Sequence, residues 1–154
     1  MSLVQELMNH NNVDSFRASD VVKRFTPTEI REAIQNLITN EQTELAYALG
    51  EAGLSLHPQS EDMLAMNGLL AILRNDWEQA VEMLEDLKAI QGDKTQPFTF
   101  VMLVRALRCN LDPARAIEVV REGLALYPDQ IELVSEKLSL DEFADVMVHS
   151  ESIQ

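Results

Sequence analysis

The sequence of 154 residues is poor in residues that several common kinds of protein require. Its one cysteine, Cys109, excludes an internal disulfide framework and fits a reducing compartment. Five glycines and five prolines are too few for the many turns of a β-sandwich or β-barrel. Twelve basic residues stand against 26 acidic ones, and the net charge of −14 repels phosphate backbones and anionic lipid. We therefore expect neither nucleic acid nor a membrane surface as a partner.

Signals for export and for catalysis are also missing. The start, MSLVQELMNHNN, has neither a basic region nor a long apolar run, so we expect a cytoplasmic protein. No Gly-rich phosphate loop, HExxH or GxSxG pattern occurs. The three histidines lie far apart in sequence; Asp145 and His149 are one helical turn apart, but a metal site needs three or four ligands. We expect no catalytic residues, no metal and no cofactor.

What the sequence does contain is a series of helix signals. In FTPTEIREAIQNLITN, Thr26 is a candidate N-cap, Pro27 takes the first helical position and Glu29 completes a capping box. Apolar residues then recur at helical spacing. These residues are Ile30, Ile34 and Leu37. A second helix follows after Asn40, which is suited to end the first one in a left-handed conformation.

A sequence repeat extends this helix pair along the chain. EAGLSLHP at 51–58 and REGLALYP at 121–128 lie seventy residues apart, and Asn40, Asn75 and Asn110 are spaced by thirty-five. The spacing predicts three helix pairs, at about 26–58, 60–92 and 97–128. End helices are expected within 1–25 and 129–149, the latter as two short helices with Ser139 capping the second. Solenoids need such ends to cover the last apolar face. A chain of 154 residues is enough for one domain, so we expect a single domain over 1–154.

The middle pair, NGLLAILRNDWEQAVEML, resembles the tetratricopeptide repeat, a helix–turn–helix unit of 34 residues. Gly68 and Ala80 stand at the positions where that family needs small residues, because the two helices cross closely there. Ile34 and Val104 replace the small residue of the first helix in the outer pairs. The resemblance implies an all-α fold, an α-solenoid of three such pairs, with the first helix of each pair lining a protein-binding groove.

The first helices of the second and third pairs carry apolar residues on more than one side. If Leu64, Gly68 and Ala71 pack on the partner helix, a second apolar side remains, and a helix that is apolar all round is buried all round. The same pattern in PFTFVMLVRALRC leaves two arginines outward, which would suit a partner segment with some acidic charge. The resemblance makes these outward positions groove residues. The candidate protein-binding residues are Leu69, Ile72, Leu73, Phe98, Val101, Arg105 and Arg108.

Two functions fit this surface. The first is a non-enzymatic adaptor or chaperone that holds an apolar segment of a partner protein; in size, charge and repeat the chain resembles the chaperones of bacterial type III secretion. The second is a structural or regulatory subunit that forms a homodimer through the same surface. The chain's own N-terminal helix, with Leu3, Val4, Leu7 and Met8, could also fill the groove, since large apolar patches are rarely left bare.

Overall fold

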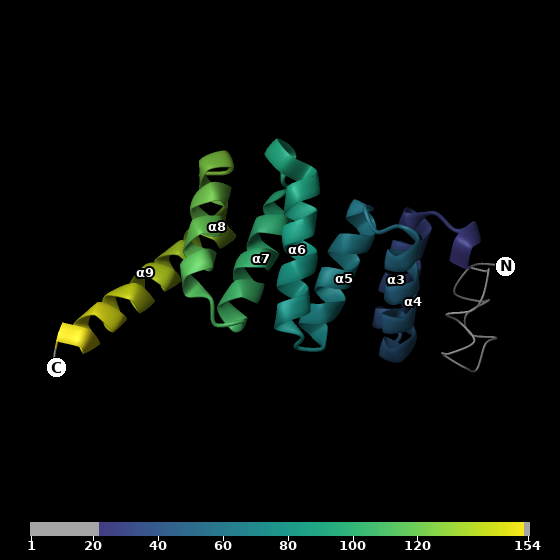
Figure 1. The fold of residues 1–154 in the computed structure, drawn as a ribbon, viewed down its shortest axis with the longest axis horizontal. Helices are drawn as coiled ribbons and strands as arrows, with labels where there is room; N and C mark the ends of the chain where they lie inside the picture. Colours follow the sequence, from purple (N-terminus) through teal and green to yellow (C-terminus); the bar gives the residue numbers. More distant parts are fainter. Residues whose placement is uncertain (1–21, 153–154) are drawn as a thin grey trace. The chain divides into compact units, whose positions relative to one another are not determined.

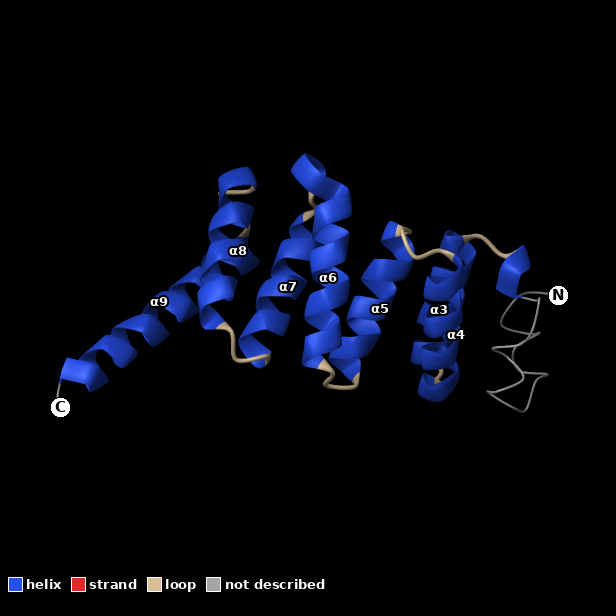
Figure 2. Cartoon of the chain, in the orientation of Figure 1, coloured by secondary structure: helices blue, strands red, loops and turns tan. Residues whose placement is uncertain are grey.

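The structure is a computed structural model that describes residues 22–152, with side chains described as far as 146. Every regular element in this part of the chain is a helix (Figure 2). They are η1 (Val22–Arg24), α3 (Pro27–Thr39), α4 (Thr43–Leu56), α5 (Glu61–Leu73), α6 (Trp77–Gln91), η2 (Gly92–Lys94), α7 (Pro97–Cys109), α8 (Pro113–Leu126) and α9 (Ile131–Ser152). The predicted all-α class and the three helix pairs are confirmed. The predicted N-terminal helix and its loop lie outside the described residues.

The described residues belong to two compact units, divided between Ile90 and Gln91. The first unit holds α3 to α6 and the second holds α7 to α9 (Figure 1). The expectation of a single domain over 1–154 stays a prediction.

The first unit begins with the predicted capping box. Thr26 Oγ1 accepts the N–H of Glu29 at 3.2 Å, and the Glu29 carboxylate accepts the N–H of Thr26 at 3.2 Å. These two bonds satisfy backbone donors that have no partner inside the helix, and they fix where α3 starts. The stripe that follows is fully buried, and it packs with residues of η1, α4 and α5 in one core. Its residues are Ile30, Ile34 and Leu37.

The second unit is built in the same way from α7 and α8, which lie side by side (Figure 1). Asp112 caps α8 by accepting the N–H of Arg115 at 3.2 Å. The core residue Phe100 meets the ring of Tyr127 edge-on, at 6.4 Å between centroids. The Tyr127 hydroxyl donates to the carbonyl of Thr95 at 2.8 Å, so the end of α8 is tied to the start of α7.

The turn inside each pair differs from the prediction in its register. The residues with positive φ are Glu41, Asn75 and Leu111, at φ of 60–61°, whereas Asn40 and Asn110 have φ of −89° and −82°. Each turn is a Schellman motif: the left-handed residue and the one after it donate their N–H groups to carbonyls three and five residues back, at 2.8–3.1 Å. The structural period is therefore 34 and then 36 residues (75 − 41 and 111 − 75). The prediction that Asn40 adopts the left-handed conformation was wrong.

The seventy-residue sequence match has a structural cause in two glycines. A Cβ on Gly53 of α4 would lie 2.5 Å from Met63 Sδ and 3.1 Å from Ile30. A Cβ on Gly123 of α8 would lie 2.9 Å from Leu133 Cδ1 and 3.0 Å from Phe100 Cγ. Ile30 and Phe100 are seventy residues apart, and so are Met63 and Leu133. The same close crossing of three helices thus occurs in both units.

The C-terminal end is one helix where two were predicted. No glycine, proline or asparagine interrupts the chain between Ile131 and Ser152, and α9 runs through this range unbroken. Ser139 caps no helix; its hydroxyl accepts a hydrogen bond from Arg108 Nη2 at 3.1 Å. The prediction of a helix start at Ser139 was wrong because it rested on residue types that favour a cap, with no chain-breaking residue before them.

Candidate protein-binding surface

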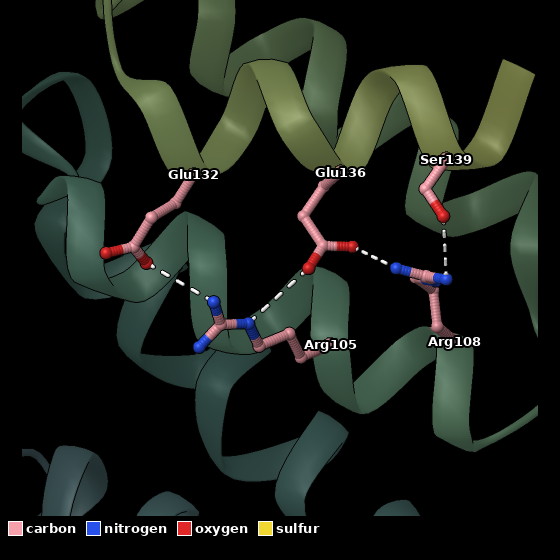
Figure 3. A network of polar contacts seen from close by, with 5 residues as sticks. All are labelled: Arg105, Arg108, Glu132, Glu136 and Ser139. Atoms are coloured by element: carbon pink, nitrogen blue, oxygen red, sulfur yellow. Dashed lines mark hydrogen bonds and ion pairs between the residues drawn. The ribbon is translucent and has the colours of Figure 1, made fainter.

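Two arginines of α7 were predicted to face a partner, and the structure pairs them with α9 of their own unit (Figure 3). Arg105 Nε lies 3.4 Å from Glu136 Oε1, and its Nη2 lies 3.4 Å from Glu132 Oε2. Arg108 Nη1 bonds the other oxygen of Glu136. Glu136 thus joins Arg105 and Arg108 in one network.

This network stabilises a carboxylate that is almost removed from water. The Glu136 side chain is 11% exposed, and a buried charge is costly unless it is paired and hydrogen-bonded. The arginine side chains keep 50% and 39% of their surface exposed, so water screens that end of each pair. Arg105 and Arg108 therefore contribute to holding α9 on α7, and their role toward a partner segment stays a prediction.

The other two predicted residues of α7 differ from each other in exposure. Val101, expected on the outward side, is 3% exposed and belongs to the core of the second unit. Phe98 is 49% exposed. The helical spacing placed Val101 on the face opposite α8, but α9 also packs on α7 and takes part of that face.

The three predicted residues of α5 form an apolar surface on the first unit. Leu64, Gly68 and Ala71 are buried, as predicted, and a Cβ on Gly68 would lie 3.0 Å from Leu84 of α6. On the second apolar side, Leu69 and Ile72 are half-buried and Leu73 is 49% exposed. Leu69 also packs against the core of its unit. The uncovered apolar surface of α5 is therefore centred on Ile72 and Leu73.

An open cleft of about 440 Å³ lies beside Arg108 in the second unit. Its apolar lining comes from the α7–α8 turn and from α9, and Ser139 adds a hydroxyl. The lining residues beside Arg108 and Ser139 are Leu111, Pro113, Leu140 and Phe143. Sequence reasoning did not find this cleft, because it forms only where α9 continues past Ser139 as one helix.

Within residues 22–146, no three His, Cys, Asp or Glu side chains converge in a way that could hold a metal ion. None of the helices between residues 22 and 152 combines the length and the apolar content that a membrane crossing requires.

Solved structures share this fold, whereas no protein-family model and no curated protein matches the sequence. YrrB, described as a TPR protein with an unusual peptide-binding site, is 15% identical with a TM-score of 0.65; the match covers 82% of this chain and 64% of YrrB. The MamA RS-1 ArsTM double mutant is 15% identical with a TM-score of 0.70, over 93% of this chain and 82% of that one. The assembly chaperone of RpL4, Acl4, is 16% identical with a TM-score of 0.60, over 97% and 59%.

These likenesses identify the fold. The chain is an all-α protein with tetratricopeptide-like helix pairs, as the resemblance of the middle pair implied. It spans less than two thirds of the YrrB and Acl4 chains that it matches. At identities of 15–16% the likeness extends to the fold and not to a shared activity.

Proposed function

We propose that this protein is a non-enzymatic protein–protein interaction module, an adaptor or chaperone that holds an apolar segment of a partner protein. The observation that carries the proposal is the surface of α5. Gly68 of this helix packs against Leu84 of α6, while on another side Ile72 is only half-buried and Leu73 is 49% exposed. A soluble protein gains nothing in stability from exposed leucine, whereas a partner that removes it from water gains about 25 cal/mol per Å² of apolar area.

The structural neighbours support this class of function. YrrB is described as a TPR protein with a peptide-binding site, and Acl4 as an assembly chaperone. Phe98, half exposed on α7 of the second unit, is a further candidate contact. Among specific roles we propose a chaperone like those of bacterial type III secretion, on the basis of the small size, the charge of −14 and the repeat.

The partner segment that we propose is not acidic, unlike the one expected from the sequence. Because Arg105 and Arg108 are engaged by glutamates of α9, they add little attraction for an acidic segment. An apolar partner segment with few charges, or with basic ones, fits the acidic chain better.

Self-assembly through the same surface is the alternative function. It is supported by the same surface, the half-buried Ile72 and the exposed Leu73, since a second copy could cover them. Measuring the mass in solution at low and high protein concentration separates the two: a constant monomer mass supports a module that awaits a partner, and a mass that doubles supports a homodimer.

The test of the proposed function compares partner capture by variants at positions of equal exposure. Leu73→Glu places a charge on the proposed surface of α5, and Phe98→Glu places one at the further candidate contact on α7. Leu126→Glu is the matched control, since Leu126 of α8 is also 49% exposed. All three should leave helicity and melting nearly unchanged, because surface substitutions usually stay within about 0.5 kcal/mol. Co-purification of the partner from source cells should be lost in Leu73→Glu and kept in Leu126→Glu. Equal capture by these two variants would contradict the proposal.

A further inference from the structure

The helix α9 occupies the place of a first helix in a fourth pair. Leu133 meets Gly123 and is buried with Phe100, as Met63 of α5 meets Gly53 and is buried with Ile30. Met63 and Leu133 are seventy residues apart, so each position of α5 has its equivalent in α9 seventy residues later.

The face that α5 buries on the side of its partner helix is exposed to solvent in α9. Leu64 and Gly68 of α5 are buried, and Gly68 lies against Leu84 of α6. Their equivalents in α9, Val134 and Leu138, are 39% and 59% exposed. Ile131, on the same side one turn before Val134, is exposed as well. We call Ile131, Val134 and Leu138 the α9 stripe.

No described segment covers the α9 stripe as α6 covers α5. The first helices α3, α5 and α7 end in a left-handed turn at Glu41, Asn75 and Leu111, and the chain then returns as the second helix. At the equivalent position, Asp145, α9 continues as helix. The repeat itself therefore shows what fits on the stripe: one antiparallel helix that presents a small residue at the crossing, as the buried Ala46, Ala80 and Ala116 do in α4, α6 and α8.

The acidic residues next to the α9 stripe favour a basic helix as its partner. Asp141, Glu142 and Asp145 follow Leu138 at three, four and seven residues, so they continue the same face of the helix. In α5 the residue equivalent to Asp141 is the buried Ala71. Asp141 already pairs with Lys137 at 3.2 Å, whereas Glu142 and Asp145 are exposed. A helix that docks here meets apolar side chains at one end and carboxylates at the other.

We propose that the α9 stripe binds one amphipathic helix of a partner protein, with lysine or arginine beside its apolar face. This helix takes the place that a fourth second helix would occupy. A second copy of this chain is a poorer occupant, because two chains that each carry a charge of −14 repel one another. The site is distinct from the residues of the proposed function on α5, and the inference does not depend on them.

A synthetic peptide tests this inference on the full chain. The probe is a labelled peptide with the sequence of α8, Pro113–Leu126, carrying Glu118→Lys and Glu122→Lys. Both glutamates are exposed in α8, so the changes keep its apolar face and take the charge from zero to +4. The unchanged α8 peptide is the control. We expect the basic peptide to bind, and to bind more tightly at low salt, since rim charges act through long-range attraction.

Variants of the protein locate the binding. Leu138→Glu should lower the affinity for the basic peptide by at least about tenfold, which corresponds to about 1.4 kcal/mol, because a buried unpaired carboxylate is costly. Leu126→Glu, at similar exposure, should leave it unchanged, and so should Leu73→Glu. Glu142→Lys combined with Asp145→Lys should lower the protein's affinity for the basic peptide and leave its affinity for the neutral α8 peptide unchanged. Loss of peptide binding in Leu73→Glu would count against this site while leaving the proposed function intact.

Three results would overturn the inference. The first is no binding of the basic peptide, or equal binding to the protein and to Leu138→Glu. The second is a wild-type dimer that becomes a monomer in Leu138→Glu, which would make a second copy the occupant. The third is a fall of more than about 5 °C in the melting temperature of Leu138→Glu, since an exposed site should shift it by no more than about 2 °C. That fall would show that the chain itself covers the stripe.

Discussion

Gly123→Ala is expected to destabilise the second unit although alanine is the better helix former. The Cβ of an alanine at this position in α8 would lie 2.9 Å from Leu133 Cδ1, 3.0 Å from Phe100 Cγ and 3.2 Å from Phe100 Cβ. Separations of 3.4–4 Å are ordinary contacts, so three atoms of two neighbouring side chains, Leu133 and Phe100, must give way together. The Cβ of Phe100 is tied to the backbone of α7 and cannot move without it.

The magnitude follows from two opposing effects. Alanine in place of glycine in a helix interior contributes about 1 kcal/mol. Overpacking a close crossing costs about 1–3 kcal/mol. We expect a net loss of up to about 2 kcal/mol, which lowers the melting temperature by up to about 8 °C for a protein of this length. Gly68→Ala should cost less, because its added Cβ meets only the side chain of Leu84.

Thermal unfolding followed by circular dichroism measures this effect. Arg121→Ala and Arg121→Gly, at an exposed position of the same helix, give the alanine–glycine difference without the crossing. Leu133→Ala added to Gly123→Ala should cost less than the sum of the two single changes, because it removes the closest neighbour. If Gly123→Ala instead raises the melting temperature by the difference found at Arg121, α8 does not cross Phe100 and Leu133 as closely as described.

Two further substitutions test the network and the turn. Glu136→Ala should lower the free energy of unfolding by about 1–3 kcal/mol, since it removes charged hydrogen bonds; a double-mutant cycle with Arg108→Ala should show coupling, and additive losses would contradict the network. Leu111→Gly should raise the stability by about 0.5–1 kcal/mol, because Leu111 adopts φ of 61° while its side chain is almost fully exposed. Leu111→Ala should bring no such gain, and equal melting temperatures for the two would refute the strain.

The helix pairs could be predicted from the sequence because their signals are local. Thr26, Pro27 and Glu29 form a capping box from adjacent residues, and Ser60 caps α5 by accepting the N–H of Met63 at 3.3 Å. The small residues at Gly68 and Ala80 lie within one pair, and both are buried as expected. Such features need no knowledge of distant parts of the chain.

The features that the sequence did not predict depend on residues far along the chain, or on the spacing of three asparagines alone. The equal spacing of Asn40, Asn75 and Asn110 hid a period of 34 and then 36 residues, because the extra residues enter near η2, between the second and third pairs. Arg105 is engaged by α9, which lies about thirty residues further along the chain, and Val101 on the same helix is buried. Helical spacing on α7 alone cannot show that a third helix packs there.

Site-specific photo-crosslinking tests most directly whether the exposed apolar surface of α5 binds the partner. Leu73 and, as a control, Ile90 of α6, which is exposed to a comparable degree in the same unit, are each replaced by a photo-reactive amino acid in source cells. The proposed function predicts a covalent adduct of one defined mass with a different protein at position 73 and none at position 90. Adducts at position 90 and none at 73 would contradict it, and an adduct of twice the chain's own mass at 73 would assign the surface to a homodimer.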